Sequence, residues 1–315
     1  MACAPGNTTW EIGVKKMDTG KLQAWLMASR PRTLPAAVSP VLVGSAMAFS
    51  VGRFRAGPAL AALLGALCIQ IGANFANDYM DFQKGADAKG RLGPTRVTTA
   101  GLISLRAIQA GTLAVFGLAV VCGVYLAWQA GWPVIVIGLL SILSALAYTG
   151  GPYPLGYNGL GEVFVFLFFG LAAVGGTYFV QAGSYTPAVL AASLPVGLIV
   201  MAILVVNNLR DIPTDRESGK RTTAVRFGEA WTRGEYILML AAAYVVPLVM
   251  AISRLTTPWV LLSWLSLPTA FDLVRHVNSD TGRLLNRALG GTGILVLYYS
   301  LFFSAGLILG RLLGM

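Results

Sequence analysis

The sequence predicts an all-α membrane protein, and two observations support that fold class. The chain of 315 residues is 56% hydrophobic and only 11% charged, whereas a soluble domain carries roughly 25% charged residues. The charges are also segregated, since none occurs from Ala107 to Gly161 or from Val163 to Leu209. About 20 apolar residues cross a bilayer once, so each of these uncharged tracts is long enough for more than one crossing.

Glycine, proline and polar clusters divide the apolar sequence into nine expected transmembrane helices. In chain order these helices cover residues 33–51, 58–79, 105–128, 132–149, 161–181, 187–208, 234–253, 257–272 and 288–311. The eighth is the shortest and contains Pro258 and Pro268. Residues 1–20 are polar and mixed, and we expect them to form a flexible tail in front of a single transmembrane domain over residues 21–315.

The distribution of basic residues predicts the orientation of these helices. If the N-terminus is cytoplasmic, every Lys and Arg except Arg53, Arg55, Arg254 and Arg311 lies in the tail or in a loop on the cytoplasmic side. This asymmetry follows the positive-inside rule, which also explains the net charge of +10 without a nucleic-acid partner. We therefore expect a multi-pass protein of the cytoplasmic (inner) membrane, in contact with membrane lipid and not with nucleic acid.

Two acidic segments lie where expected helices reach the cytoplasmic boundary. The first, NDYMDFQKGAD, covers residues 77–87, and the second, NNLRDIPTDRESGKRT, covers residues 207–222. Together they hold six of the 13 acidic residues of the chain. Ionisable groups at the edge of a membrane span are costly and indicate a functional site by default.

The spacing within these segments has a chemical meaning. Asn77 and Asp81 are four residues apart, and the same interval separates Asn207, Asp211 and Asp215. Side chains at this interval share one face of a helix. Two such faces turned toward each other would form a cage of oxygen ligands, which suits Mg²⁺ completed by substrate phosphates. Interleaved Lys and Arg residues could neutralise the remaining phosphate oxygens, so the pattern predicts both a metal and an anion.

Several alternatives stay open from the residues alone. Asp78 is rotated by about 100° from Asn77 and could only support the site. Pro213 either bends the second helix or marks its end near Asp211. A single acidic segment could also be a solvated loop with salt bridges, but two matched segments on one side favour a site. A secondary transporter is possible, although transporters place ionisable groups near the membrane midplane.

These segments resemble the UbiA superfamily of intramembrane prenyltransferases, which has nine helices, and the resemblance covers nearly the whole chain. The typical first motif is N-x-x-x-D-x-x-x-D; here Gly85 replaces the last Asp and Asp87 follows, as in the 1,4-dihydroxy-2-naphthoate polyprenyltransferase branch. At Pro213 an acidic or polar residue is more usual. The other matching stretches are RPRTLPAAVSPVLVG (30–44), AYTGGPYPLGYNGLGE (147–162), VVNNLRDIPTDRESGKRTTAVRFG (205–228) and LNRALGGTGILVLYY (285–299).

The resemblance implies an Mg²⁺-dependent enzyme whose active site faces the cytoplasm. It would transfer a polyprenyl group from polyprenyl diphosphate to 1,4-dihydroxy-2-naphthoate, with loss of carbon dioxide and pyrophosphate, giving demethylmenaquinone. The alternative within the family is an enzyme with another acceptor, such as 4-hydroxybenzoate, homogentisate or a haem.

The resemblance also implies roles for individual residues. Asn77, Asp81 and Asp87 would hold one Mg²⁺ with the diphosphate, and Asp211 and Asp215 would hold the second. Tyr148 would line the acceptor end of the site. The residues expected to contact the diphosphate or support the second metal are Lys84, Arg91, Arg210, Lys220, Asn207 and Asn208.

Overall fold

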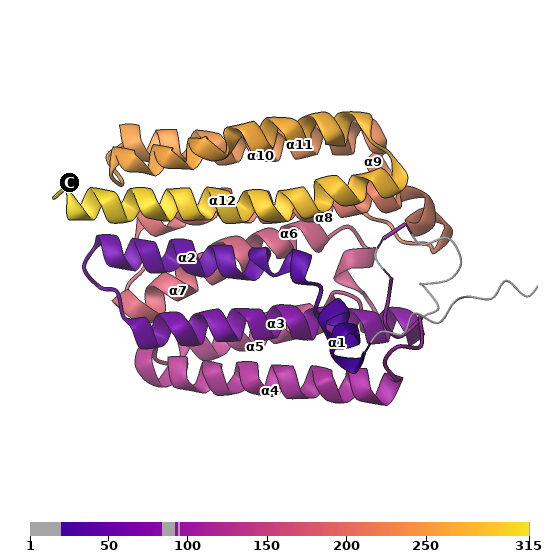
Figure 1. The fold of residues 1–315 in the computed structure, drawn as a ribbon. Helices are drawn as coiled ribbons and strands as arrows, with labels where there is room; N and C mark the ends of the chain where they lie inside the picture. Colours follow the sequence, from indigo (N-terminus) through magenta and orange to yellow (C-terminus); the bar gives the residue numbers. More distant parts are fainter. Residues whose placement is uncertain (1–19, 84–91, 94, 315) are drawn as a thin grey trace, which may run out of the picture.

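The chain folds into a bundle of long helices that lie side by side (Figure 1). The computed structural model describes residues 20–83, 92–93 and 95–314, and every regular element within these ranges is helical. The elements are α1 (Lys21–Ser29), η1 (Pro31–Thr33), α2 (Pro35–Ser50), α3 (Ala56–Gln83), α4 (Leu105–Ala130), α5 (Pro133–Ala147), η2 (Leu155–Tyr157), α6 (Gly161–Val165), η3 (Phe166–Ala172), α7 (Ala173–Ala182), α8 (Pro187–Glu217), α9 (Thr223–Phe227), α10 (Glu229–Ile252), η4 (Pro258–Ser266), α11 (Leu267–Ser279), η5 (Gly282–Leu284) and α12 (Leu285–Leu312).

All of the helices expected from the sequence are present. Fewer of them meet the length and apolarity expected of a helix that crosses a membrane. Six helical segments are long and apolar enough to cross a membrane, and a seventh is added if the bent pair Lys21–Thr33 and Pro35–Ser50 forms one span. The segment Pro133–Thr149 is apolar but shorter. The all-α membrane fold is therefore confirmed, whereas nine crossings and a cytoplasmic N-terminus stay predictions.

Local sequence signals explain where several helices begin. Ser104 and Thr186 precede α4 and α8, and the hydroxyl of each accepts a hydrogen bond from a backbone N–H three residues later, at 3.3 Å in both cases. Such caps satisfy N–H groups that have no partner within the helix. Pro35, Pro133 and Pro187 occupy first helical positions, where a missing N–H costs nothing.

Helix α8 continues through Pro213 and ends only at Glu217. The expected alternative that the helix ends near Asp211 is therefore wrong. A proline removes one backbone hydrogen bond, and helices of membrane proteins tolerate this loss when neighbouring groups compensate. Asp211 and Asp215 consequently belong to the same continuous helix.

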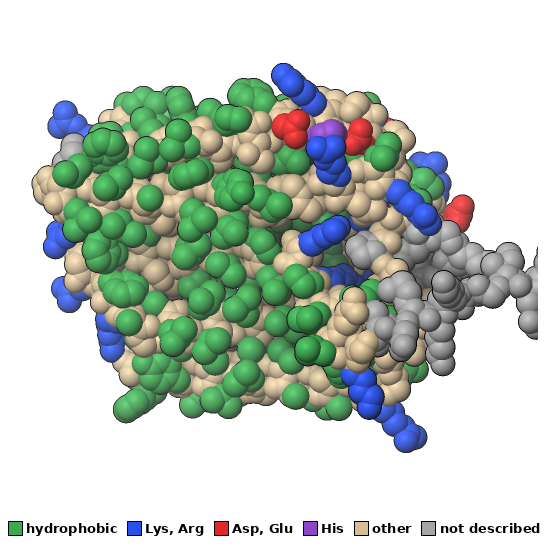
Figure 2. All heavy atoms as spheres, viewed as in Figure 1, with side chains coloured by type: hydrophobic (Ala, Val, Ile, Leu, Met, Phe, Trp, Pro, Cys, Tyr) green, Lys and Arg blue, Asp and Glu red, His purple; other side chains and the backbone are tan. Residues whose placement is uncertain are grey.

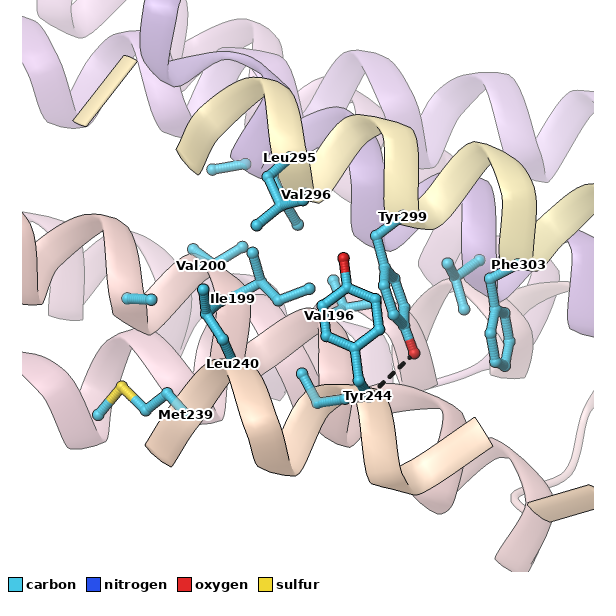
Figure 3. Packing of buried hydrophobic residues seen from close by; sticks show 14 of the residues in the cluster. Val196, Ile199, Val200, Met239, Leu240, Tyr244, Leu295, Val296, Tyr299 and Phe303 are labelled. Atoms are coloured by element: carbon cyan, nitrogen blue, oxygen red, sulfur yellow. Dashed lines mark hydrogen bonds between the residues drawn. The ribbon is translucent and has the colours of Figure 1, made fainter. Parts of the chain in front are cut away.

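The largest buried cluster joins α2, α7, α8, α10 and α12. Within it the rings of Tyr244 and Tyr299 meet edge to face at 5.5 Å, and Tyr299 stacks on Phe303 at 6.0 Å. The Tyr299 hydroxyl donates a hydrogen bond of 3.2 Å to the carbonyl of Ala243 (Figure 3). Because lipid tails are as apolar as this interior, close packing and satisfied polar groups hold such a bundle together.

Glycines allow the closest helix contacts. A Cβ added at Gly306 of α12 would lie 2.1 Å from the carbonyl oxygen of Trp259 in η4. In the π-helical segment η3, a Cβ at Gly170 would lie 2.9 Å from the Cα of Gly197 in α8. Small residues at helix crossings are a general device of membrane bundles, and here they bring α12 and α8 against their neighbours.

The described charged residues divide between two parts of the bundle. We call one half of the bundle the carboxylate half. Helices α3 and α8 end there, and helices α6 and α10 begin there. We call the opposite end, with Arg53, Arg55, Arg254 and Arg311, the arginine end. Figure 2 shows a broad band of hydrophobic side chains between charged groups at the two ends. The described acids of the carboxylate half are Asp78, Asp81, Glu162, Asp211, Asp215, Glu217, Glu229, Glu235, Asp272 and Asp280.

Candidate active site

The first acidic segment lies in the last turns of α3. The Oδ1 atom of Asn77 accepts a hydrogen bond of 2.6 Å from the hydroxyl of Thr149. One turn later, the Oδ1 atom of Asp81 accepts one of 2.8 Å from the hydroxyl of Tyr157. Both side chains therefore point toward the stretch that follows α5, which confirms the shared helix face expected from their spacing.

Asp78 contributes to a buried ion cluster at the end of α3. Arg96 lies between Asp78, at 3.5 Å, and Asp81, with which it makes a close hydrogen-bonded ion pair. The backbone N–H of Thr98 also donates to Asp78 at 3.4 Å. Because one guanidinium contacts both carboxylates, Asp78 helps to position Asp81, a role that the sequence left open.

Arg210 organises the second acidic segment from within the bundle. Its side chain is only 1% exposed and makes a two-point ion pair with Asp211, at 2.8 and 2.6 Å. It also donates to the side-chain oxygens of Asn207 and Asn286, each at 2.7 Å. Two-point arginine–carboxylate pairs fix orientation as well as charge, so this network sets the position of Asp211 on α8.

Tyr157 is the first bridge between the two acidic segments. Its hydroxyl donates to Asp81, and the ammonium of Lys220 lies 4.8 Å from the centre of its ring. Lys220 in turn makes an ion pair of 3.0 Å with Asp215. The backbone carbonyl of Tyr157 also accepts from the N–H of Arg221 at 2.7 Å. One tyrosine therefore joins the end of α3 to the end of α8.

Asn286 of α12 forms a second bridge. Its side-chain oxygen accepts from Arg210, and its amide donates to the backbone carbonyl of Leu92 at 2.9 Å. Leu92 follows the first acidic segment in the chain. The two segments thus lie in the same half of the bundle and share neighbours, as the magnesium–diphosphate hypothesis requires.

The two asparagines of the second segment face different partners. Asn207 accepts from Arg210, whereas Asn208 donates a hydrogen bond of 2.8 Å to Glu162 at the start of α6. Glu162 is buried and also accepts from the hydroxyl of Thr223. Only Asn207 therefore joins the network around Asp211, while Asn208 ties α8 to α6.

Tyr148 packs against η2 and the start of α6. A Cβ added at Gly156 or Gly161 would come within 2.8 or 3.2 Å of its side chain, so both glycines make room for the tyrosine ring. Its backbone carbonyl also accepts a hydrogen bond of 3.0 Å from the N–H of Gly156. The expected place of Tyr148 at the acceptor end stays a prediction.

The residues expected to hold magnesium have suitable ligand atoms, but the described ones are not grouped as a metal site. Within the described residues the expected magnesium ligands are Asp81, Asp211 and Asp215, which supply hard oxygen ligands of the type that Mg²⁺ prefers. Their ion-pair partners in the described part of the chain are Arg96, Arg210 and Lys220. No group of three or more His, Cys, Asp or Glu is arranged as a metal site among the described residues. Three expected site residues, Lys84, Asp87 and Arg91, lie outside the described residues.

Sequence reasoning missed three residues of the network. Glu162 carried a signal, because it is the only charge between Ala107 and Leu209. Tyr157 lay within a stretch that matched the family, but nothing in its spacing pointed to Asp81. Asn286 also lay within a stretch that matched the family, residues 285–299, but its two partners are set by tertiary packing alone.

Two acidic segments lie together in one half of an apolar helix bundle, and the comparisons with known proteins show which family has this architecture. The chain belongs to the UbiA prenyltransferase family, whose model matches residues 37–289. It is 38% identical over 289 residues to a 1,4-dihydroxy-2-naphthoate octaprenyltransferase of Mycobacterium tuberculosis, covering 91% of this chain and 98% of the relative. The Escherichia coli protein of the same name is 36% identical, with 83% and 87% covered.

Solved structures show the same fold at low sequence identity. A UbiA homologue from Archaeoglobus fulgidus, described as bound to DMAPP and Mg²⁺, has a TM-score of 0.66 and 15% identity, covering 90% of this chain and 99% of its own. A homologue from Aeropyrum pernix K1 also has a TM-score of 0.66, with 17% identity and 87% and 97% covered. Membership of a prenyltransferase family identifies a multi-pass membrane enzyme and decides against the secondary-transporter alternative.

Proposed function

We propose that this protein transfers a polyprenyl group from polyprenyl diphosphate to 1,4-dihydroxy-2-naphthoate, giving carbon dioxide, pyrophosphate and the prenylated naphthalenediol, which is the reduced form of demethylmenaquinone. Relatives from M. tuberculosis and E. coli, with most of this chain aligned, carry the name of that activity. The observation that supports it most strongly is the double bridge, through Tyr157 and Asn286, between the two acidic segments. It brings both sets of carboxylates to one place where a single diphosphate could bind.

Magnesium is part of this proposal. Asp81 and Asp87 would hold one ion, and Asp211 and Asp215 would hold the second, with Asn77 and Asn207 as neighbouring oxygen donors. When bound, Mg²⁺ supplies charge neutralisation for the departing pyrophosphate. Homologues of the same fold from A. fulgidus, described as bound to DMAPP or GPP with Mg²⁺, support this part of the proposal.

The basic residues of the site have two roles in the proposed cycle. Without substrate, Arg96, Arg210 and Lys220 keep the carboxylates paired and in place. When the diphosphate is bound, these three basic residues would contact its phosphate oxygens, together with Lys84 and Arg91. Stabilising charge as it develops on a leaving group is the main way in which such sites accelerate reactions.

The bond changes follow from the proposed substrates. The allylic carbon–oxygen bond of the donor breaks, and its electron pair leaves with pyrophosphate. The ring carbon of the acceptor that bears the carboxylate forms the new carbon–carbon bond, and carbon dioxide departs with the loss of that carboxylate. Tyr148, which packs against η2 and the start of α6, would line the space for the acceptor ring. The apolar tail of the donor would extend between the helices toward lipid.

The proposed orientation places the carboxylate half at the cytoplasmic face of the inner membrane. It rests on the excess of Lys and Arg in the loops of that half. A water-soluble acceptor and the released pyrophosphate would then exchange directly with the cytoplasm.

The acceptor is the part of the proposal that most needs an experiment. Purified protein in detergent with Mg²⁺ is incubated with one of three acceptors, 1,4-dihydroxy-2-naphthoate, 4-hydroxybenzoate or homogentisate, and with prenyl diphosphates of several lengths. Mass spectrometry then identifies the products. We expect a decarboxylated prenyl naphthalenediol from the first acceptor only, and a product from either of the others in its place would contradict the proposal.

Substitutions connect this activity to the site. Asp81→Ala and Asp211→Ala are each expected to lower the rate by roughly 100-fold or more, the usual effect of removing a charge-stabilising group. Asp272→Ala is the matched control, because Asp272 lies in the same half of the bundle on the exposed surface of α11, with its side chain 62% exposed. Normal activity of folded Asp81→Ala or Asp211→Ala would refute the assignment of these residues.

A further inference from the structure

The arginine end carries positive charge without any described carboxylate to balance it. Arg53, Arg55, Arg254 and Arg311 lie at the ends of helices that run away from the acidic segments, and all described Asp and Glu side chains belong to the carboxylate half. In Figure 2 the same contrast is visible, with blue side chains but no red ones at the end of the bundle where the chain terminates. The described residues therefore supply no carboxylate as a counter-anion for these arginines.

Two of these arginines, Arg254 and Arg311, line a cavity that is large enough to hold a phosphate group. The cavity has a volume of about 550 Å³ and lies between the ends of α2, α10 and α12 and the start of η4. Arg254, Arg311 and Thr257 supply polar groups to its wall, whereas Val51 and Leu307 are among its apolar lining residues. Cationic groups beside an apolar wall match a phosphate attached to a glycerol and acyl chains, because both parts of such a molecule find a complementary surface.

The arginine side chains are held in this cavity by the backbone around them. A Cβ added at Gly52, which has φ of +71°, would lie only 3.1 Å from a guanidinium nitrogen of Arg311, so the turn after α2 leaves room for that group. Arg254 itself has φ of +56° just after α10, and Arg30 is the only other non-glycine with positive φ in the part of the chain that is described. Glycine is the usual residue in this conformation, so an arginine there indicates a use for its side chain.

We propose that this cavity is a binding site for the phosphate headgroup of an anionic phospholipid in the leaflet opposite the active site. Arg254 and Arg311 bind the phosphate, and the acyl chains lie along the apolar wall. A bound lipid would hold the ends of α2, α10 and α12 together at the end of the bundle far from the chemistry.

The test measures lipid retention by native mass spectrometry of the purified protein in neutral detergent. Mixed micelles contain phosphatidylglycerol or phosphatidylcholine, and inorganic phosphate is added in a separate arm. We expect phosphatidylglycerol to be retained in preference to phosphatidylcholine. An arginine near an anionic lipid contributes roughly fivefold to affinity, so the double variant Arg254→Gln, Arg311→Gln should lose about 30-fold. Arg275→Gln, an exposed arginine of α11, is the matched control.

Each alternative outcome is decisive. Equal retention of the two lipids, or retention unchanged in the double variant, would overturn the site. Displacement of phosphatidylglycerol by millimolar inorganic phosphate would assign the cavity to a soluble anion instead of a lipid. The C-terminal carboxylate, on Met315, is outside the described residues, so a protein extended by a C-terminal affinity tag is measured in parallel. If lipid binds only in that extended form, the chain's own carboxylate is the partner and the proposal is wrong. Prenyl transfer by the double variant shows that it is folded.

Discussion

Replacing Arg210 with methionine tests the network that positions the second acidic segment. The substitution keeps most of the length of the side chain but removes its charge and all of its hydrogen-bond donors. Asp211 would lose a two-point ion pair of 2.8 and 2.6 Å, and the oxygens of Asn207 and Asn286 would each lose a donor at 2.7 Å. Because the Arg210 and Asp211 side chains are only 1% and 18% exposed, water replaces little of what is lost.

The expected cost follows from the burial of this pair. Removing one partner of a buried ion pair leaves an uncompensated charge and typically costs about 3–5 kcal/mol. Adding Asp211→Asn removes that charge, so the double variant should lose less than the sum of the two single variants, by at least about 0.5 kcal/mol. Unfolding by SDS in mixed micelles, followed by circular dichroism, measures these free energies.

Arg216→Met is the control for this prediction. Arg216 lies on the same helix and is exposed, so its substitution should change the free energy of unfolding by no more than about 0.5 kcal/mol. If Arg210→Met is no more destabilising than Arg216→Met, the buried network does not stabilise this end of α8, and the reasoning is refuted.

Three further predictions test the site and the packing. Tyr157→Phe removes the hydrogen bond to Asp81 but keeps the ring, so the KM for prenyl diphosphate should rise by about 10-fold in steady-state assays; an unchanged KM would contradict its bridging role. Gly306→Ala places a methyl group against the Trp259 carbonyl and should cost about 1–3 kcal/mol. Gly123→Ala, with no atom within 4 Å of the added methyl, should be neutral or stabilising; equal losses in the two would contradict the packing account. Chelation by EDTA should abolish prenyl transfer and added Mg²⁺ should restore it, and activity in metal-free buffer would argue against a divalent ion.

The helices and the acidic segments could be predicted because their signals are local. Apolar stretches give the helices, and an interval of four residues gives a shared face, which is why Asn77 and Asp81 both point toward the stretch after α5. Each of these inferences needs only the pitch of one helix.

The contacts that join the two segments could not be predicted because they depend on packing between distant parts of the chain. Tyr157 and Asp81 are 76 positions apart, as are Arg210 and Asn286. Pro213 was ambiguous for a similar reason, since neighbouring groups decide whether a helix continues through a proline. The cavity at the arginine end also arises only when the ends of α2, α10 and α12 meet.

The central claim is that both acidic segments act on one diphosphate, and a double-mutant cycle on substrate affinity tests it most directly. Wild-type protein, Asp81→Asn, Asp211→Asn and the double variant are titrated with a non-reactive thio analogue of a prenyl diphosphate in the presence of Mg²⁺, and Kd is measured calorimetrically. If the segments share the ligand, each single variant should weaken binding by at least about 10-fold, and the double variant should bind more weakly than either single variant. A single variant that binds like wild type would show that the two segments do not hold the same diphosphate.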